Sequence, residues 1–227
     1  MLPWITAFAV SMGFLEAAVG VYLRAVAYPH GFGFPLMALD PNLVVTELLR
    51  EAATMVMLLA PGALITRKRL ERFAWFCWTF AVWDIFYYVF LKLLLGWPES
   101  FFTWDVLFLL PTVWVGPVLA PCMVSVGLMV LAAAVLWRRE RDTQFRLHRW
   151  QWSMLIGAGA AMLFTFMEEP VRYLVAHAPG RAVGAPAMTA LDAYVPQVFQ
   201  WPLFLLACAV AMVPLAALLR PGLGNRD

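Results

Sequence analysis

The sequence predicts an all-α integral membrane protein that crosses the bilayer about six times, and two observations support this fold class. Of 227 residues, 63% are hydrophobic and 13% are charged, whereas a soluble domain carries about 25% charged residues because its surface faces water. The apolar residues also form long runs. Such runs favour spanning helices, because a helix satisfies its own backbone hydrogen bonds in lipid.

Six apolar stretches are long enough to cross a hydrocarbon core of about 30 Å, which takes about 20 helical residues. The predicted spans are 3–26, 43–66, 73–96, 112–137, 150–174 and 196–219. The weakly polar run 106–137 has 32 residues, too many for one untilted span at about 1.5 Å each. Because Pro111, Pro117 and Pro121 interrupt it, we expect a proline-broken or re-entrant segment at 100–111, before the fourth helix.

Basic residues predict the orientation of these helices. The turns at 66–72 and 138–149 and the tail at 220–227 hold eleven bases and four acids, whereas the rest of the chain holds five bases and ten acids. Cytoplasmic loops carry an excess of Lys and Arg, so these pieces and both termini are predicted to be cytoplasmic. We expect the protein to lie in a bacterial cytoplasmic (inner) membrane, with the lipid bilayer as its first partner.

Charged residues inside the predicted helices are the clearest functional signal. A charge at the centre of a transmembrane helix costs roughly 2.5–3.5 kcal/mol, so such residues must face protein or water. Glu16 and Asp84 are the deepest, since each lies eight or more residues from the nearest predicted helix end. The predicted polar site lies toward the non-cytoplasmic side and consists of Glu16, Arg24, Glu47, Arg50, Glu51, Asp84, Tyr88, Lys92, Glu168, Glu169 and Arg172.

Helical spacing predicts how these charges pair. Glu47, Arg50 and Glu51 stand at i, i+3 and i+4, and Glu168 and Glu169 lie four and three residues before Arg172, so each cluster predicts ion pairs along its own helix. For Glu16 and Asp84 the nearest base on the same face is eight residues away, or about 12 Å. Their partners are therefore predicted to come from other helices. Gly13 begins a series of small residues, which predicts close approach of a neighbouring helix.

An internal repeat is predicted within one transmembrane domain, 1–227. We expect two related helix-loop-helix units and a central hairpin, at 3–66, 150–219 and 73–137 respectively. Glu16 and Glu168 occupy corresponding places, and the intervals from Glu16 to Asp40 and from Glu168 to Asp192 are both 24 residues. The two glutamates would then be equivalent acids on either side of a central axis, where repeat-built transporters often bind their substrates.

No cofactor or metal site is predicted. The three cysteines lie singly in different apolar runs, without the CxxC spacing of metal and redox sites. The sequence also has no glycine-rich phosphate loop, HExxH or GxSxG motif. No nucleic-acid partner is expected, because membrane orientation already accounts for the basic turns.

Three functional interpretations stay open. The first is a site that binds or transports a small cation, a proton or a polar solute. The second is an accessory or assembly subunit of a membrane complex, with the aromatic-rich helix 73–96 as its contact surface. The third is a membrane-embedded enzyme that acts on a lipid or an isoprenoid, with paired carboxylates as general acid and base. A purely structural ion network fits the same charges.

Overall fold

The computed structural model describes residues 1–28, 33–36, 40–178, 190–191 and 193–220. Over these residues the chain is mostly helical, and six helices are long and apolar enough to cross a membrane. They are α1 (Leu2–Ala27), α2 (Pro41–Ile65), α3 (Arg69–Leu95), α4 (Leu119–Arg141), α5 (Arg149–His177) and α7 (Trp201–Leu219). The prediction of a multi-pass helical membrane protein is confirmed.

The ends of the helices follow from local sequence signals. The Asp40 side chain caps α2 by accepting a hydrogen bond of 2.8 Å from the Asn42 amide, and Pro41 fits the first helical position because its missing N–H has no partner there. Helix α3 ends at Gly96, whose φ of 68° is left-handed, a conformation that glycine adopts without a steric penalty.

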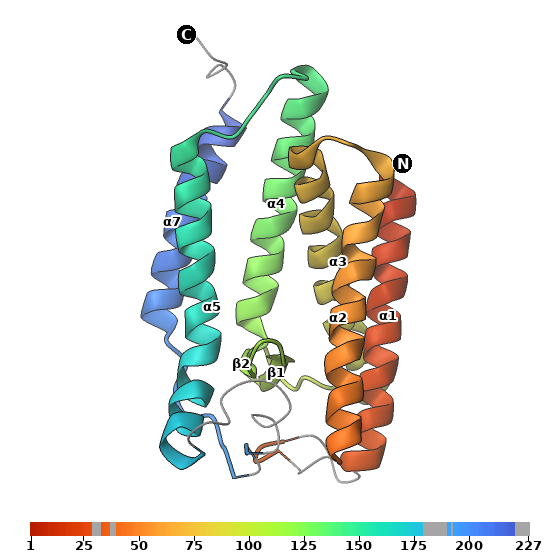
Figure 1. Ribbon diagram of the computed structural model, residues 1–227, viewed down its shortest axis with the longest axis vertical. Helices are drawn as coiled ribbons and strands as arrows, with labels where there is room; N and C mark the ends of the chain where they lie inside the picture. The colour runs from red at the N-terminus through yellow and green to blue at the C-terminus, as the bar shows by residue number, and fades with distance from the viewer. Residues whose placement is uncertain (29–32, 37–39, 179–189, 192, 221–227) are drawn as a thin grey trace.

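The helices form two groups that α4 joins (Figure 1). Helix α3 packs against α1, α2 and α4, while α5 packs against α7 and α4 also contacts α7. Gly13 allows the closest approach of α1 to α3, because a Cβ at this position would lie 2.9 Å from the carbonyl oxygen of Trp83. The small-residue series around Glu16 therefore faces α3, as close helix packing in membranes requires.

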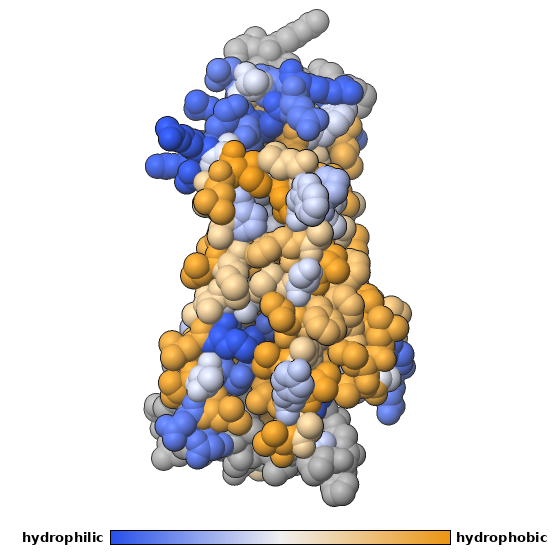
Figure 2. Space-filling view, turned by 90° about the vertical axis from the view of Figure 1, so that its right-hand side faces the viewer, coloured by the Kyte–Doolittle hydropathy of each residue, from blue (hydrophilic) through white to orange (hydrophobic). Residues whose placement is uncertain are grey.

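The surface agrees with a membrane-spanning bundle. Figure 2 shows hydrophilic residues gathered at one end and a broad apolar belt around the middle, with a smaller hydrophilic patch inside that belt. Many apolar side chains face outward, and Leu64 is 87% exposed. An apolar surface of this extent is unfavourable in water but is the normal lipid-facing surface of a membrane protein.

A β-hairpin stands where the sequence predicts a proline-broken or re-entrant segment. Strands β1 (Trp104–Phe108) and β2 (Trp114–Pro117) are antiparallel, with Asp105 opposite Gly116. The hairpin lies at the end of the bundle away from the basic turns (Figure 1). The two strands satisfy each other's backbone hydrogen bonds. A non-helical segment is therefore tolerated here, where protein surrounds it. Helix α4 consequently begins at Leu119, seven residues after the predicted start of the fourth span.

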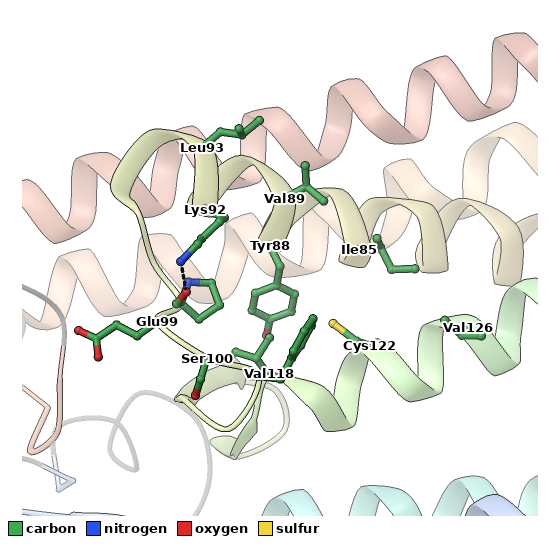
Figure 3. A pocket seen from close by; sticks show the side chains of 12 residues that line it. Ile85, Tyr88, Val89, Lys92, Leu93, Glu99, Ser100, Val118, Cys122 and Val126 are labelled. Atoms are coloured by element: carbon green, nitrogen blue, oxygen red, sulfur yellow. Dashed lines mark hydrogen bonds between the residues drawn. The ribbon is translucent and has the colours of Figure 1, made fainter.

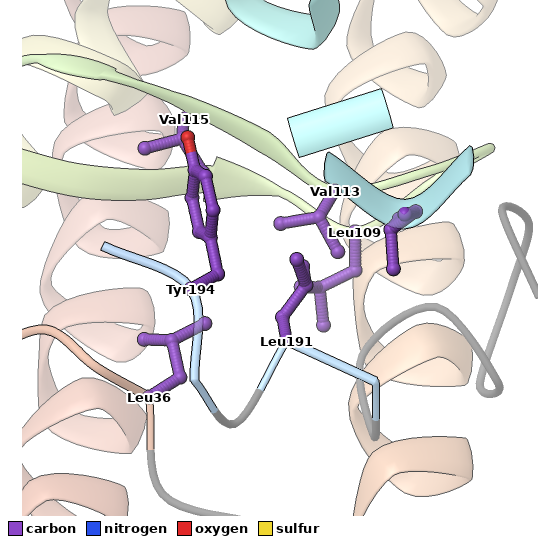
Figure 4. Packing of buried hydrophobic residues seen from close by; sticks show 7 residues of the cluster. Leu36, Leu109, Val113, Val115, Leu191 and Tyr194 are labelled. Carbon is purple, nitrogen blue, oxygen red and sulfur yellow. The ribbon is translucent and has the colours of Figure 1, made fainter. Parts of the chain in front are cut away.

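An apolar cluster fastens the hairpin to the rest of the bundle. It combines Leu109, Val113 and Val115 of the hairpin region with side chains from three other segments, Leu36, Leu174, Leu191 and Tyr194. Figure 4 shows these side chains converging from the hairpin and from the segments before α2 and α7. The cluster therefore anchors the hairpin to the neighbouring segments. This anchoring fixes the position of the polar groups that the hairpin carries.

The internal repeat stays a prediction. Helices α1 and α2 both pack on α3, whereas α5 and α7 pack on each other. Asp192, which ends the second of the two 24-residue intervals, lies outside the described residues.

Candidate functional site

Arg50 of α2 is the centre of a buried polar cluster. Its Nε donates to Glu47 Oε2 at 2.7 Å, and its Nη1 forms an ion pair and hydrogen bond with Glu16 Oε1 of α1. The Thr54 hydroxyl lies 3.4 Å from the other oxygen of Glu16. The expectation that Glu16 takes its partner from another helix is confirmed, and the pairing within 47–51 is confirmed for Glu47 and Arg50.

Glu51 connects α2 to the hairpin. Both of its carboxylate oxygens lie 3.0 Å from the backbone nitrogen of Leu109, immediately after β1. Glu51 is buried, so this amide is its main source of compensation for lost water. The hairpin thus supplies a donor that spacing along the helix does not predict.

Asp105 of β1 is the second centre of the cluster. Its Oδ1 lies 3.7 Å from Arg24 Nη2, and its Oδ2 accepts a hydrogen bond of 3.1 Å from the Tyr88 hydroxyl. Arg24 also stacks 3.7 Å above the ring of Trp97, a cation–π contact. Burial raises the pKa of Asp105 to about 6, although Arg24 and Tyr88 oppose that rise.

Asp84 lies deeper in the bundle and has a neutral partner. Its Oδ2 accepts a hydrogen bond of 2.7 Å from the Ser125 hydroxyl of α4. Among the described residues no cation lies within ion-pair distance of Asp84. The prediction that Asp84 is satisfied from another helix is confirmed, but its partner carries no charge.

Two neighbouring cavities collect these groups. The loop-side chamber has a volume of about 140 Å³ and includes Arg24, Glu47 and Asp105 in its wall. The mid-helix chamber has a volume of about 70 Å³ and includes Thr54 and Asp84. Both chambers share the wall residues Glu16, Arg50, Glu51, Tyr87 and Val106. We call the two cavities together the carboxylate chamber, and its walls carry five carboxyl groups and two guanidinium groups.

The wall of the mid-helix chamber also contains a hydrogen-bond donor that lacks an acceptor among the described residues. The indole N–H of Trp83 is buried and has no acceptor among the residues that the structure describes, and Trp83 belongs to the chamber wall. Buried polar groups almost always have a hydrogen-bond partner. The chamber therefore fits a polar occupant better than an apolar one.

Three predicted site residues on α5 lie elsewhere. Glu168 pairs with Arg172 at 3.2 Å along its own helix, with the Arg172 side chain 67% exposed. Glu169 accepts a hydrogen bond of 2.9 Å from the Gln197 amide. None of the three belongs to the wall of the carboxylate chamber, and α5 stands on the opposite side of the bundle from α1 (Figure 1).

Lys92 also lies outside the carboxylate chamber. Its ammonium group donates to the carbonyl oxygens of Gly96 and Pro98, at 2.9 and 2.8 Å, and so closes the C-terminal end of α3. It is part of an apolar groove of about 580 Å³ between α3 and α4 (Figure 3). Tyr88 forms one wall of this groove, and its hydroxyl group reaches Asp105. Tyr88 therefore separates a lipid-sized groove from the carboxylate chamber.

Several aromatic side chains of α3 make contacts within this chain. Trp83 and Tyr88 are buried, the Trp78 indole donates to Thr6 of α1 at 3.0 Å, and Phe90 stacks edge-on with Phe14. Helix α3 is the central helix of its group, and its use as a contact surface for a partner protein stays a prediction.

Sequence reasoning left out several residues of the chamber. Asp105, Tyr87, Thr54 and Ser125 take part in the cluster or its wall, and none was among the predicted site residues. Asp105 had a signal, since it is an acid next to a long apolar run. Among the described residues no group of three His, Cys, Asp or Glu side chains is arranged to hold a metal ion.

No protein-family model, curated protein or solved structure matches this chain.

Proposed function

We propose that this protein is a carrier or channel-like membrane protein whose carboxylate chamber binds protons or a small cation from the non-cytoplasmic side. The observation that carries the proposal is the charge imbalance of the chamber. Among the described residues the walls of the two cavities together carry five carboxyl groups and two guanidinium groups. Uncompensated carboxylates are costly inside a membrane protein, so protons or a bound cation are needed to balance them.

The size of the chamber favours a small occupant. A cavity needs about 10–15 Å³ to hold one water molecule, whereas pockets for drug-sized ligands measure about 300–1,000 Å³. The volumes of about 140 and 70 Å³ therefore suit protons, a few water molecules or one small ion. They are too small for a lipid.

Asp84 favours the proton among these occupants. A carboxyl group whose partner is the Ser125 hydroxyl has no counter-charge, and a proton neutralises it without any further ligand. Glu16 and Glu51 stand between Asp84 and the loop-side chamber as shared wall residues. Together these acids make a stepwise route for protons from the hairpin end toward the middle of α3.

The orientation adds a direction to this route. The basic turns lie at the end opposite the hairpin, and the positive-inside rule assigns that end to the cytoplasm. Both termini would then be cytoplasmic, in a bacterial inner membrane, and the chamber would lie near the outer leaflet.

The test is a flux assay in sealed vesicles that contain the purified full chain. A pH-sensitive dye and separate sodium and potassium gradients report which ion moves. We expect proton movement above the level of empty vesicles and its loss in Glu16→Gln, which keeps the size of the side chain. The proposal fails if vesicles with and without protein leak equally for all three ions.

The groove of Figure 3 supports a second candidate, an enzyme that acts on a lipid or isoprenoid. Its volume of about 580 Å³ suits a chain-like apolar ligand, and Lys92, Glu99 and Ser100 form its polar end. Tyr88 and Asp105 would then serve as the acid–base pair nearest to the ligand. Incubation with labelled lipid extracts tests this candidate, and it is rejected if no product forms.

A further inference from the structure

A second polar cavity lies at the opposite end of the bundle, among the basic turns. It has a volume of about 850 Å³ and lies between the start of α3 and the turn that joins α4 to α5. Four cationic side chains belong to its wall, Lys68, Arg69, Arg139 and Arg146. Among the described residues no acid belongs to that wall, so the cavity, which we call the basic pocket, fits an anion.

Two of these cations have local partners. Arg139 pairs with Glu71 at 3.0 Å and donates to the carbonyl oxygens of Thr143 and Phe145. Lys68 lies 3.4 Å from the same Glu71 carboxylate. Glu71 thus neutralises one charge, and the network holds the turn between α4 and α5 against the start of α3.

The other two cations are available for a ligand. The side chains of Arg69 and Arg146 form no hydrogen bond or ion pair with any part of the chain that the structure describes, and both are exposed. A guanidinium group binds phosphate through two parallel hydrogen bonds. Helix α3 starts beside them, and its N-cap Lys68 makes no side-chain cap, which leaves the positive end of the helix dipole facing the same space.

The floor of the basic pocket is apolar. The rings of Phe73 and Trp152 are tilted by 58° to each other with their centroids 5.1 Å apart, and Leu70 and the buried Leu147 lie beside them in the wall. A soluble anion makes no use of such a floor. A phospholipid uses both parts, because its phosphate meets the arginines while the first carbons of its acyl chains lie on the rings.

We propose that the basic pocket binds the phosphate-bearing headgroup of an anionic phospholipid from the leaflet at this end of the bundle. Arg69 and Arg146 contact the phosphate, and Phe73 and Trp152 contact the upper acyl chains. This assignment is independent of the carboxylate chamber, because the two share no wall residue.

The experiment compares two double variants of the full chain in mild detergent. Arg69→Gln/Arg146→Gln removes the two pocket arginines whose side chains have no partner among the described residues and leaves Arg139 in place. Arg67→Gln/Arg149→Gln removes two exposed arginines from the same two turns, outside the pocket wall, with the same change in net charge. Native mass spectrometry measures bound phosphatidylglycerol against phosphatidylcholine, and inorganic phosphate and glycerol phosphate are added as competitors.

We expect the native chain and the control variant to prefer phosphatidylglycerol. The pocket variant should bind it roughly 25-fold more weakly, from about fivefold for each cation near an anionic surface. Arg69→Lys/Arg146→Lys keeps both charges, so its affinity for phosphatidylglycerol should fall between those of the native chain and the pocket variant. This intermediate affinity separates a loss of phosphate recognition from a folding defect. Equal losses in the pocket and control variants, or no preference over phosphatidylcholine, would overturn the proposal. Competition by the soluble phosphates at equal concentration would instead assign the pocket to a soluble ligand.

Discussion

The acids of α1, α2 and the hairpin differ from those of α5 in their surroundings, although the sequence patterns look alike. Both regions place glutamates three or four residues from an arginine. Around Arg50 the partners come from two helices, with Glu47 buried and Glu16 half-buried, whereas Arg172 extends from a single helix and is 67% exposed. Spacing along a helix therefore predicts a pair, but only a second element that covers the pair makes it a site.

Arg50→Ala should have the largest effect on stability. It removes the counter-charge of Glu16 and Glu47, and since the Arg50 side chain is 25% exposed we expect a loss of about 3 kcal/mol, the lower end of the cost of breaking a buried ion pair. Arg172→Ala is the matched change on α5 and should cost less than about 0.5 kcal/mol, since exposed pairs contribute little. Unfolding in mixed detergent micelles measures both. Similar losses for the two variants would remove the distinction between the regions.

The ionisation of Asp105 should be the next largest effect. Its pKa is about 6 in the folded chain against an ordinary value of 3.8, so the folded state holds more protons in that interval. The free energy of unfolding should therefore fall as pH rises from about 4 to about 6, by on the order of 2 kcal/mol from this group.

Asp105→Asn should remove that contribution, while Glu168→Gln on α5 should leave it in place. The measurement is the free energy of unfolding at several pH values for the three chains. If Asp105→Asn leaves the change of the unfolding free energy with pH unaltered, other groups cause that pH dependence.

Glu51 and Glu169 each accept a hydrogen bond from a backbone amide, and we expect a smaller difference in stability between their alanine variants. Glu51→Ala leaves the Leu109 amide without its acceptor in a buried place, which costs about 1–3 kcal/mol. Glu169→Ala frees the Gln197 amide at an exposed place, where water replaces the acceptor and the change should stay within about 0.5 kcal/mol. Glu51→Gln retains an acceptor oxygen and should fall between. Faster hydrogen exchange at Leu109 in Glu51→Ala alone would support this account.

Alanine substitutions at Gly13 and Gly157 should give the smallest difference in stability. A methyl group at Gly13 meets the Trp83 carbonyl oxygen at 2.9 Å, so Gly13→Ala should lose about 1 kcal/mol after its gain in helix propensity. Nothing lies within 4 Å of the same position at Gly157, and Gly157→Ala should be neutral or stabilising. Thermal unfolding of both variants checks this, and a stable Gly13→Ala would contradict the close packing of α1 on α3.

The sequence predicted the helices and the deep acids because both depend on local properties. Apolar runs define the spans, and the burial cost of Glu16 and Asp84 requires partners on other helices. The hairpin was missed because its register depends on pairing across a turn and on the Glu51 bond to Leu109, which no periodicity reveals.

Lys92 and the α5 acids are the opposite case, because the sequence predicted them as site residues and the fold places them outside the carboxylate chamber. Periodicity placed Lys92 on the face of Asp84, but a lysine near a helix end binds the free carbonyl groups there, as it does at Gly96. Glu168 resembles Glu16 in its sequence setting. The two differ because the Glu16 side of α1 is covered by α2 and α3, a property of the tertiary fold alone.

The most direct test of the central claim is proton flux in vesicles that contain Asp84→Asn or Glu168→Gln, at matched protein content. Each variant removes one ionisable carboxyl group with little change in size, one inside the carboxylate chamber and one outside it. We predict that Asp84→Asn reduces the initial rate to that of empty vesicles and that Glu168→Gln keeps the native rate. An unchanged rate in Asp84→Asn, or an equal loss in both variants, would contradict the account.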